Sequence, residues 1–458
     1  MRPDEVQRLV LRAPRGTAVA HLILRIPEGL GRVAADLLHT KLSASFGVPL
    51  YDQPCCSIGV SFDGLVALGV PEAYLRLYRR LAPAFSDGAV RRSVRVGDSG
   101  PSAASNWNAK FAQASAHVLV SWHGPRADVD NAALELAGAW SKKLGTSQPE
   151  PLIGERLGAP KNEVGEWVHF GYRDGISEVS IDDTCSRPDA SDCRKHKPGA
   201  LLLTEINDAG FNLFALSRAP EKVRGFFRES SFGILRPMKQ DLASFEEAID
   251  RWVGETQAAV GSPVTRDFVK AKLCGRWPDG RMVKPGEYTP QGSSLQLDFS
   301  EDGAGEGCPF GSHVRRMRAA PDASGHAFER PLQRRSLPFG PAIWSGRPTD
   351  DKSRGLLGHF FCASIEDQFE HLLGQWAARP PVGFPTEASA LDPLIGPHDD
   401  LDAALVVPHK GRPPQRLQGF RAWTTTQGTM YAWYPGQSGL KALLEDDFVP
   451  EDGEGPWL

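Results

Sequence analysis

His313 and Arg334 carry side chains that could act together on a bound peroxide. His313 stands in the run Gly307-Cys308-Pro309-Phe310-Gly311-Ser312-His313-Val314-Arg315-Arg316, and Arg334 opens the later run Arg334-Arg335-Ser336-Leu337-Pro338-Phe339-Gly340. A neutral imidazole is a common ligand of haem iron, and a guanidinium can stabilise negative charge that develops on an oxygen atom. The pairing therefore suggests haem-dependent chemistry on a peroxide.

A third candidate is Asp174, in the run Phe170-Gly171-Tyr172-Arg173-Asp174-Gly175-Ile176-Ser177. Two flanking glycines permit a tight turn that brings a short carboxylate close to a flat cofactor, although an Asp-Gly pair taken alone is more often a plain turn. Peroxide cleavage needs a group that moves a proton between the two oxygens, and a carboxylate can do this. The sequence thus offers a ligand, a proton carrier and a cation.

The neighbours of His313 strengthen its case. The chain has 12 histidines, and any one of them taken alone is more often a surface or core residue than a ligand. Arg315 and Arg316 follow it directly, and paired guanidinium groups suit the propionates of a haem. We therefore expect both arginines to help bind the cofactor.

Composition excludes several other classes of protein. The 458 residues are 41% hydrophobic, enough for a large core and two or three domains. A net charge of −4 gives no basic field for nucleic acid or anionic lipid, and no apolar run approaches the roughly 18 residues that span a bilayer. The first residues resemble neither a secretory signal nor a twin-arginine signal, so we expect a cytoplasmic protein without membrane contacts.

The seven cysteines are too irregularly spaced for a disulfide framework. Cys185, Cys193 and His196 could bind a metal, but the cysteines are further apart than zinc sites usually place them and a fourth ligand is missing. A local disulfide, or simple loop residues, are the alternatives.

Strand and helix patterns alternate in both halves of the chain. Apolar or alternating runs predict strands over 20–27, 56–62, 116–122, 232–235 and 359–363. Helical spacing predicts helices over 28–46, 129–144 with Asp128 as N-cap, 241–256 and 365–377. The polar stretch over 182–199 reads as an exposed loop or boundary. This order favours an α+β class built from two split β-α-β units, each a sheet with helices on one face.

At these motifs the chain resembles the dye-decolorizing peroxidases. The run containing Asp174 matches the GxxDG signature of that family, the run over 308–316 matches its proximal-histidine segment, and the run over 334–340 matches its distal-arginine segment. The three motifs occur in the family's order, and weaker matches extend the resemblance from about residue 5 to about residue 400. Three linked motifs are far more specific than a lone GxxDG.

The resemblance implies a fold and a cofactor. It implies two ferredoxin-like α+β domains with antiparallel sheets, which we place at residues 1–195, with the GxxDG motif, and 196–458, which would hold most of the haem. It implies one haem b per chain, with His313 as proximal ligand and metal-binding residue. Asp174 would be the distal acid/base and Arg334 the distal cation.

The implied activity is reduction of hydrogen peroxide, coupled to one-electron oxidation of dyes, phenols or other small aromatic reductants, with surface Trp or Tyr as further oxidation sites. The resemblance leaves the physiological reductant open, as well as the formation of a homo-oligomer. A haem-binding or haem-handling protein for transfer or iron release, with little turnover, is the alternative, and a haem-free binding module is a third. The presence of both Asp174 and Arg334 favours the peroxidase.

Four further residues enter the predicted site. Asp392 is a candidate carboxylate partner of His313, and Ser336 stands where many relatives have Gly or Asn. The chain departs from the family in the run over 355–363, where His359 replaces an apolar pocket residue, while Phe361 keeps the aromatic. We expect Phe361 in the haem pocket. His359 would face or flank the peroxide, with a strand position that points elsewhere as the alternative.

Overall fold

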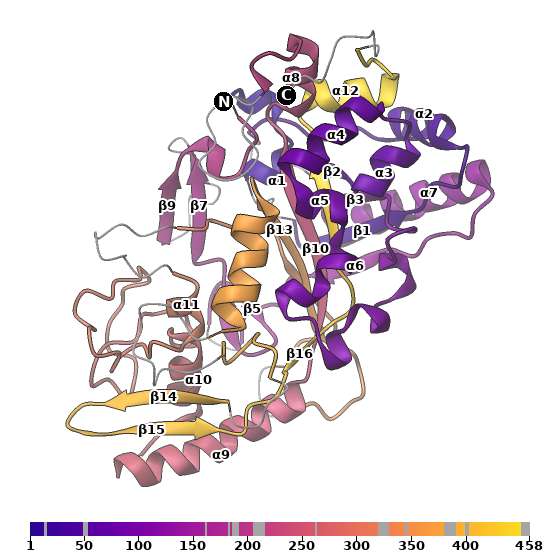
Figure 1. Ribbon diagram of the computed structural model, residues 1–458. Helices are drawn as coiled ribbons and strands as arrows, with labels where there is room; N and C mark the ends of the chain where they lie inside the picture. Colours follow the sequence, from indigo (N-terminus) through magenta and orange to yellow (C-terminus); the bar gives the residue numbers. More distant parts are fainter. Residues whose placement is uncertain are drawn as a thin grey trace.

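The computed structural model describes residues 1–12, 16–48, 54–160, 163–181, 184–185, 192–204, 216–261, 263–318, 329–343, 347–379, 391–398 and 403–449. Within these ranges the chain forms one large antiparallel sheet with helices packed along it, and a smaller lobe below (Figure 1). The smaller lobe is made by the hairpin β14–β15 and the helices α9, α10 and α11.

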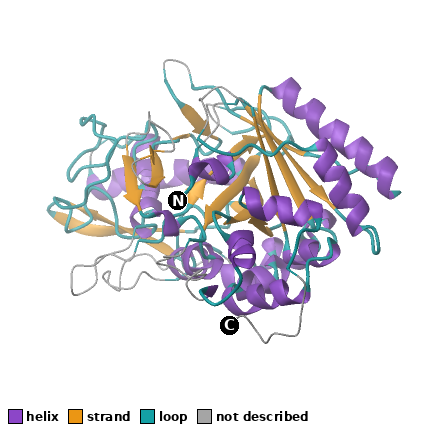
Figure 2. Ribbon diagram, turned by 90° about the horizontal axis from the view of Figure 1, so that it is seen from above, coloured by secondary structure: helices purple, strands orange, loops and turns teal. Residues whose placement is uncertain are grey.

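The large sheet joins strands from both halves of the chain. Its path runs β11-β13-β10-β17-β2-β3-β1-β4, with β12 paired to β13 and β16 paired to β10. Figure 2 shows these strands from above, twisted relative to one another. The strands are β1 (Ala18–Leu24), β2 (Cys55–Val60), β3 (Val118–Gly124), β4 (Leu152–Glu155), β10 (Ser231–Gln240), β11 (Gln333–Arg334), β12 (Leu337–Phe339), β13 (Gly355–Cys362), β16 (Thr424–Thr426) and β17 (Met430–Tyr434).

The two ends of this sheet approach one another. Val19 of β1 packs with Leu337 of β12 and Leu357 of β13 in a small buried cluster. Gly154 of β4 lies so close to Leu357 that a Cβ there would stand 3.1 Å from its Cδ1. The sheet therefore curls, and the side chains on its inner face are enclosed.

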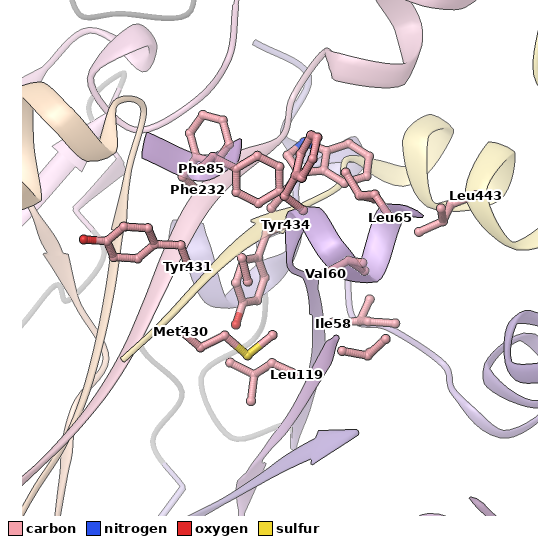
Figure 3. Close-up of a cluster of buried hydrophobic side chains, with 14 of the residues drawn as sticks. Ile58, Val60, Leu65, Phe85, Leu119, Phe232, Met430, Tyr431, Tyr434 and Leu443 are labelled. Carbon is pink, nitrogen blue, oxygen red and sulfur yellow. The ribbon is translucent and has the colours of Figure 1, made fainter. Parts of the chain in front are cut away.

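The helices bury apolar faces against the sheet and against each other. In the first half these are α1 (Arg8–Leu11), α2 (Gly31–Lys41), α3 (Phe62–Ala67), α4 (Glu72–Leu81), α5 (Pro83–Asp87), α6 (Ala89–Arg92) and α7 (Arg126–Leu144). In the second half they are α8 (Glu221–Phe227), α9 (Leu242–Val260), α10 (Arg266–Cys274), α11 (His313–Arg316), the π-helical segments η8 (Ile365–Glu370) and η9 (Leu372–Ala377), and α12 (Gln437–Glu445). Figure 3 shows part of the main core, where Phe85 of α5 and Leu65 of α3 pack with Phe232 and Tyr434 of the sheet.

Short strands outside the large sheet carry part of the site. The strands β5 (Glu166–Val168) and β6 (Tyr172–Asp174) form a hairpin, and β7 (Ser177–Ile181) pairs with β8 (Thr184–Cys185) and β9 (Asp192–His196). The remaining hairpin, β14 (Ala404–His409) with β15 (Arg412–Gln418), covers a second core built around Trp252 and Trp423.

Most predicted elements are present with shifted ends. The helix predicted over 241–256 is α9, capped by Asp241, whose Oδ1 accepts a hydrogen bond from Ser244 N at 3.1 Å. Asp128 is not an N-cap, because α7 already begins at Arg126 after Pro125. The described part of 182–199 is not loop alone, since β8 and β9 lie in it. The predicted boundary between residues 195 and 196 falls inside β9 and stays a prediction.

Candidate active site

A cavity of about 520 Å³ lies between the large sheet and the smaller lobe. Its lining includes His313, Asp174, Arg334 and Ser336, which the sequence places in three separate motifs. A volume of this size is typical of sites that enclose a cofactor or small ligand. The fold thus brings the predicted ligand, acid and cation to one cavity.

His313 is the first residue of α11 and reaches the cavity with 26% of its side chain exposed. Its Nδ1 lies 2.9 Å from Oδ2 of Asp392, whose side chain is fully buried. Oδ1 of Asp392 accepts hydrogen bonds from Leu394 N at 2.9 Å and Ile395 N at 3.1 Å. Because Nδ1 is engaged by the carboxylate, Nε2 is the ring nitrogen left to bind a metal.

The charge of Asp392 is held by its surroundings. Burial alone would raise the pKa of this carboxyl, but the electrostatic interaction and hydrogen bond with His313 and the charge of Arg316 lower the pKa further than burial raises it. A carboxylate on the far side of an imidazole fixes its tautomer and makes it a more basic ligand. The hydrogen bond with Asp392 therefore gives His313 the tautomer and orientation that an iron ligand needs.

The loop before His313 is anchored below the cavity. Asp302 accepts hydrogen bonds from the backbone nitrogens of Gly307 at 2.9 Å and Cys308 at 2.7 Å. Lys272 donates to the carbonyls of Glu306 and Gly307 at 2.7 and 2.8 Å. These bonds satisfy buried backbone groups in a segment without regular structure, and so fix where α11 begins.

Asp174 is the last residue of β6 and lines the cavity half-buried. Gly171 and Gly175, on either side of this strand, have φ angles of 77° and 71°. Residues with a Cβ rarely adopt that conformation, so both turns favour glycine. The predicted turn is present, and it carries the carboxylate into the cavity.

Arg334 and Arg335 are neighbours with different environments. Arg334 is exposed in the cavity, and its Nη2 donates to Ser177 O at 2.8 Å. Arg335 is buried, where Nη1 lies 3.3 Å from Oε2 of Glu178 and Nε donates to Leu9 O at 2.8 Å. Of the two, Arg334 is therefore the one whose guanidinium is available to a ligand in the cavity.

The aromatic residue of β13 that faces the cavity is not the predicted one. Phe360 and Leu356 line the cavity, whereas Phe361 is fully buried in the main core. Successive side chains of a strand point to opposite faces, so a shift of one residue exchanges the two phenylalanines. The geometry contradicts the expectation that Phe361 lines the cavity, and puts Phe360 there instead.

The same alternation removes His359 from the cavity. His359 is fully buried on the inner face of the sheet, where Nε2 lies 2.8 Å from the hydroxyl of Tyr434. Its backbone N–H donates to Ser336 Oγ at 3.1 Å. The expectation that the His359 side chain faces the peroxide does not fit this position, and the alternative, a strand residue pointing elsewhere, does.

The two arginines after His313 are also directed away from the cavity. Arg315 is buried against Asp302, with Nη1 2.9 Å from Oδ2, and donates to Cys308 O at 2.6 Å. Arg316 is buried and donates from Nε to Trp376 O at 2.9 Å. Neither lines the cavity, so their geometry contradicts a direct bond to haem propionates. Both instead fix the helix that carries His313.

A different arginine, Arg318, lines the cavity where Arg315 and Arg316 were expected. Arg318, two residues beyond the end of α11, lines the cavity and donates from Nη2 to Asp192 at 2.7 Å. The sequence signal for it was present, since it continues the cluster of arginines after His313. Only the direction of the short helix decides which member of the cluster reaches the cavity.

The charge of the lining suits an anionic cofactor. Among the described residues, nine arginines and five carboxylates line the cavity, an excess of four positive charges before histidines are considered. Apolar side chains such as Leu356, Phe360 and Leu394 complete the wall. An iron ligand, an apolar wall and an excess of guanidinium groups fit a haem with its two propionates. The arginines are Arg156, Arg173, Arg194, Arg236, Arg276, Arg318, Arg330, Arg334 and Arg335, and the acids are Asp98, Glu166, Asp174, Glu178 and Glu329.

The alternative metal site at Cys185, Cys193 and His196 has no free thiol at Cys193, and the side chain of Cys185 lies outside the described part of the chain. Cys193 is disulfide-bonded, and within the described ranges no cluster of three or more His, Cys, Asp or Glu side chains could hold a metal ion. Nor is any helix in those ranges long and apolar enough to cross a membrane.

Comparison with known proteins identifies relatives over nearly the whole chain. The chain is 24% identical over 445 residues to the dye-decolorizing peroxidase msp1 of Mycetinis scorodonius, covering 90% of this chain and 81% of that protein. It is 25% identical over 378 residues to the multifunctional dye peroxidase DyP2 of an Amycolatopsis species, covering 78% and 74%. The chain is a homologue of the dye-decolorizing peroxidases. No protein-family model matches it.

Solved structures of dye-decolorizing peroxidases share the fold. A fungal enzyme of this type from Auricularia auricula-judae superposes with a TM-score of 0.74 at 19% identity, covering 97% of this chain and 99% of the other. The Anabaena enzyme superposes with a TM-score of 0.72 at 18% identity, covering 96% of this chain and 94% of the other. The predicted family, the α+β class with ferredoxin-like sheets and the peroxidase type of enzyme are confirmed. The roles of individual site residues stay predictions.

Proposed function

We propose that the protein is a haem-dependent peroxidase that reduces hydrogen peroxide and oxidises dyes, phenols or other small aromatic reductants in one-electron steps. The observation that carries the proposal is the meeting of His313, backed by Asp392, with Asp174 and Arg334 at one cavity. The relatives named above are dye peroxidases, and one solved relative is described in complex with 2,6-dimethoxyphenol. One haem b per chain remains the proposed cofactor.

The residues that would hold the haem follow from the cavity. Nε2 of His313 would bind the iron, and Arg318, with other guanidinium groups of the lining, would pair with the propionates. When bound, haem would supply the redox-active iron that accepts oxidising equivalents from peroxide. Asp392 would keep the Nδ1 proton of His313 in place and so present a neutral Nε2.

The chain's own part in the chemistry is proton transfer and charge stabilisation. Asp174 would accept the proton of one peroxide oxygen and deliver it to the other, which then leaves as water. The Arg334 guanidinium, held by its bond to Ser177 O, would stabilise negative charge on the departing oxygen.

A spectroscopic experiment tests this function. Purified protein loaded with haem should show a histidine-ligated absorption spectrum that His313→Ala loses. Adding hydrogen peroxide should change that spectrum rapidly, and adding a phenol should restore it. Haem binding without any response to peroxide would instead favour the haem-handling alternative, and a normal histidine-ligated spectrum in His313→Ala would remove the axial assignment.

A further inference from the structure

Three buried histidines and a tyrosine form a polar cluster on the enclosed face of the large sheet. His21 of β1, His123 of β3, His359 of β13 and Tyr434 of β17 are each at most 4% exposed. The His21 ring lies 5.1 Å from that of His359 and 6.0 Å from that of His123, centroid to centroid. Buried polar groups are costly in an apolar interior, so a cluster of this size calls for an explanation.

Within this cluster Tyr434 and His359 form a close pair. The phenol oxygen lies 2.8 Å from Nε2 of His359. The Tyr434 ring lies over two glycines of the neighbouring strands, Gly59 and Gly233, where an added Cβ would stand 2.6 and 2.3 Å from its ring carbons. The ring of Phe361 closes the third side at 4.9 Å in an edge-to-face contact. The phenol is therefore held in one position against the imidazole.

The protonation states of the pair suit a phenol that donates to a neutral imidazole. Burial, with smaller effects from His21, His123 and Arg335, lowers the pKa of His359 well below its ordinary value. Burial raises the pKa of Tyr434, and the hydrogen bond with Ser121 opposes that only in part. In the resting protein the tyrosine thus keeps its proton, and the histidine is an uncharged acceptor.

A short bonded path connects the pair to the active-site cavity. Ser336, which lines the cavity, accepts a hydrogen bond from the backbone N–H of His359 at 3.1 Å. The carbonyl of His359 accepts from Arg335 N at 2.7 Å. From the cavity wall to the phenol, the path thus consists of one hydrogen bond, the covalent frame of His359 and a second hydrogen bond.

We propose that Tyr434 and His359 form an internal redox relay. In this relay Tyr434 gives one electron to the oxidant that hydrogen peroxide generates in the cavity, while the phenolic proton of Tyr434 moves to Nε2 of His359. The O–H bond of the phenol breaks, an N–H bond of imidazolium forms, and a neutral tyrosyl radical remains. The oxidant is the oxidising equivalent that the reaction with hydrogen peroxide would leave on the cofactor in the cavity. The relay therefore rests on the proposed function. An external reductant later returns the electron, and His359 returns the proton.

The buried imidazolium does not prevent this step. Burial and the positive charge of Arg335 disfavour a protonated His359. Because the proton of Tyr434 has to move to this imidazole, the tyrosine becomes harder to oxidise. A one-electron oxidised phenol is nevertheless a far stronger acid than any imidazolium, so the proton still moves to the histidine. The relay would store one oxidising equivalent inside the sheet when no reductant occupies the cavity.

The test is electron paramagnetic resonance of the haem-loaded protein, frozen soon after addition of hydrogen peroxide without a reductant. We expect an organic radical whose spectrum narrows when the protein contains ring-deuterated tyrosine. Tyr434→Phe keeps the ring and should lose this signal. His359→Gln keeps a hydrogen-bond partner for the phenol but no base, and should lose the signal or shorten its lifetime.

Tyr431→Phe is the matched control. Tyr431 lies on the same strand and is equally buried, but its hydroxyl bonds to Oε1 of Glu370 at 3.1 Å and points in another direction (Figure 3). The tyrosyl signal should survive this change. A signal that survives Tyr434→Phe, or disappears only in Tyr431→Phe, overturns the relay.

Two further outcomes separate the relay from the proposed function. If peroxide changes the haem spectrum but no tyrosyl radical forms, the relay is wrong and the peroxidase stands. If peroxide produces no spectral change at all, the proposed function fails and the relay fails with it. Should Tyr434→Phe not fold, His359→Gln decides alone, because an unchanged signal and lifetime in that variant contradict the proton transfer.

Discussion

Asp392 and His313 are joined by a 2.9 Å hydrogen bond although 79 positions separate them in the chain. The carboxylate is fully buried and the imidazole is not, so the pair links the interior of the smaller lobe to the cavity. The acid contributes nothing to the cavity wall itself. Its effect on chemistry has to pass through His313.

Asp392→Asn should therefore weaken cofactor binding without reshaping the cavity. Asparagine keeps the oxygen that accepts from Leu394 N and Ile395 N, but it removes the charge that makes His313 a basic ligand. Changes to such supporting partners typically cost about 10–100-fold in metal affinity or activity. We expect weaker haem affinity in a titration and a more positive iron reduction potential. An unchanged potential would show that the carboxylate only positions the ring.

Asp174→Asn should slow the reaction with peroxide while leaving haem loading intact. The amide cannot accept the peroxide proton, and general acid–base catalysis commonly contributes about 10²–10⁴-fold. Stopped-flow absorbance after mixing with peroxide measures this step. Asp279→Asn is a matched control, because Asp279 also precedes a glycine but bonds to Arg281 outside the cavity. Equal rates in the two variants would assign the proton transfer to another group.

Arg334 and Arg335 should separate function from stability. Arg334→Leu removes the guanidinium exposed in the cavity, and we expect the peroxide step to slow by about 10²–10³-fold. Arg335→Leu removes the cation of a buried ion pair with Glu178, which should lower the free energy of unfolding by about 3–5 kcal/mol. Peroxide kinetics and urea denaturation on both variants measure the two effects. The reverse pattern would exchange the roles of the two arginines.

The sequence predicted the strands and helices well where apolar periodicity was strong. The helix over 241–256 and the strand over 116–122 appear as α9 and β3 with ends moved by a few residues. The pairing of β17 with β2 was out of reach, since it joins Trp433 to Val60 across most of the chain. Local patterns contain no information about such distant partners.

The site was predicted to the level of motifs but not of side-chain direction. His313, Asp174 and Arg334 reach one cavity because each lies at the end of a short element fixed by glycine turns or buried ion pairs. The errors at Phe361 and at Arg315 have one cause. A strand or a short helix can turn by one residue without changing the motif, and only packing decides which side chain faces the ligand.

Phe360→Ala and Phe361→Ala should test that strand register directly. Phe361 is fully buried, so its truncation leaves a cavity in the core and should destabilise the protein by about 3–5 kcal/mol. Phe360 is half-buried at the cavity, and its truncation should alter the haem spectrum with a much smaller loss of stability. Urea denaturation and the absorption spectrum of each variant would check both expectations. A larger loss of stability at residue 360 would contradict the register.

The buried histidines should make the protein less stable in acid. Burial lowers the pKa of His21 from 6.5 to about 3, so between these values the unfolded chain binds a proton that the folded chain does not. The contribution of His21 to stability is therefore fully present above pH 6.5 and is lost as the pH drops, by about 1.4 kcal/mol per pH unit. Urea denaturation at several pH values between 6.5 and about 4 measures the slope. His21→Gln should reduce it by that amount, whereas His39→Gln, at an exposed position of α2, should leave it unchanged. Equal slopes in the parent and His21→Gln would show that His21 is protonated in the folded protein.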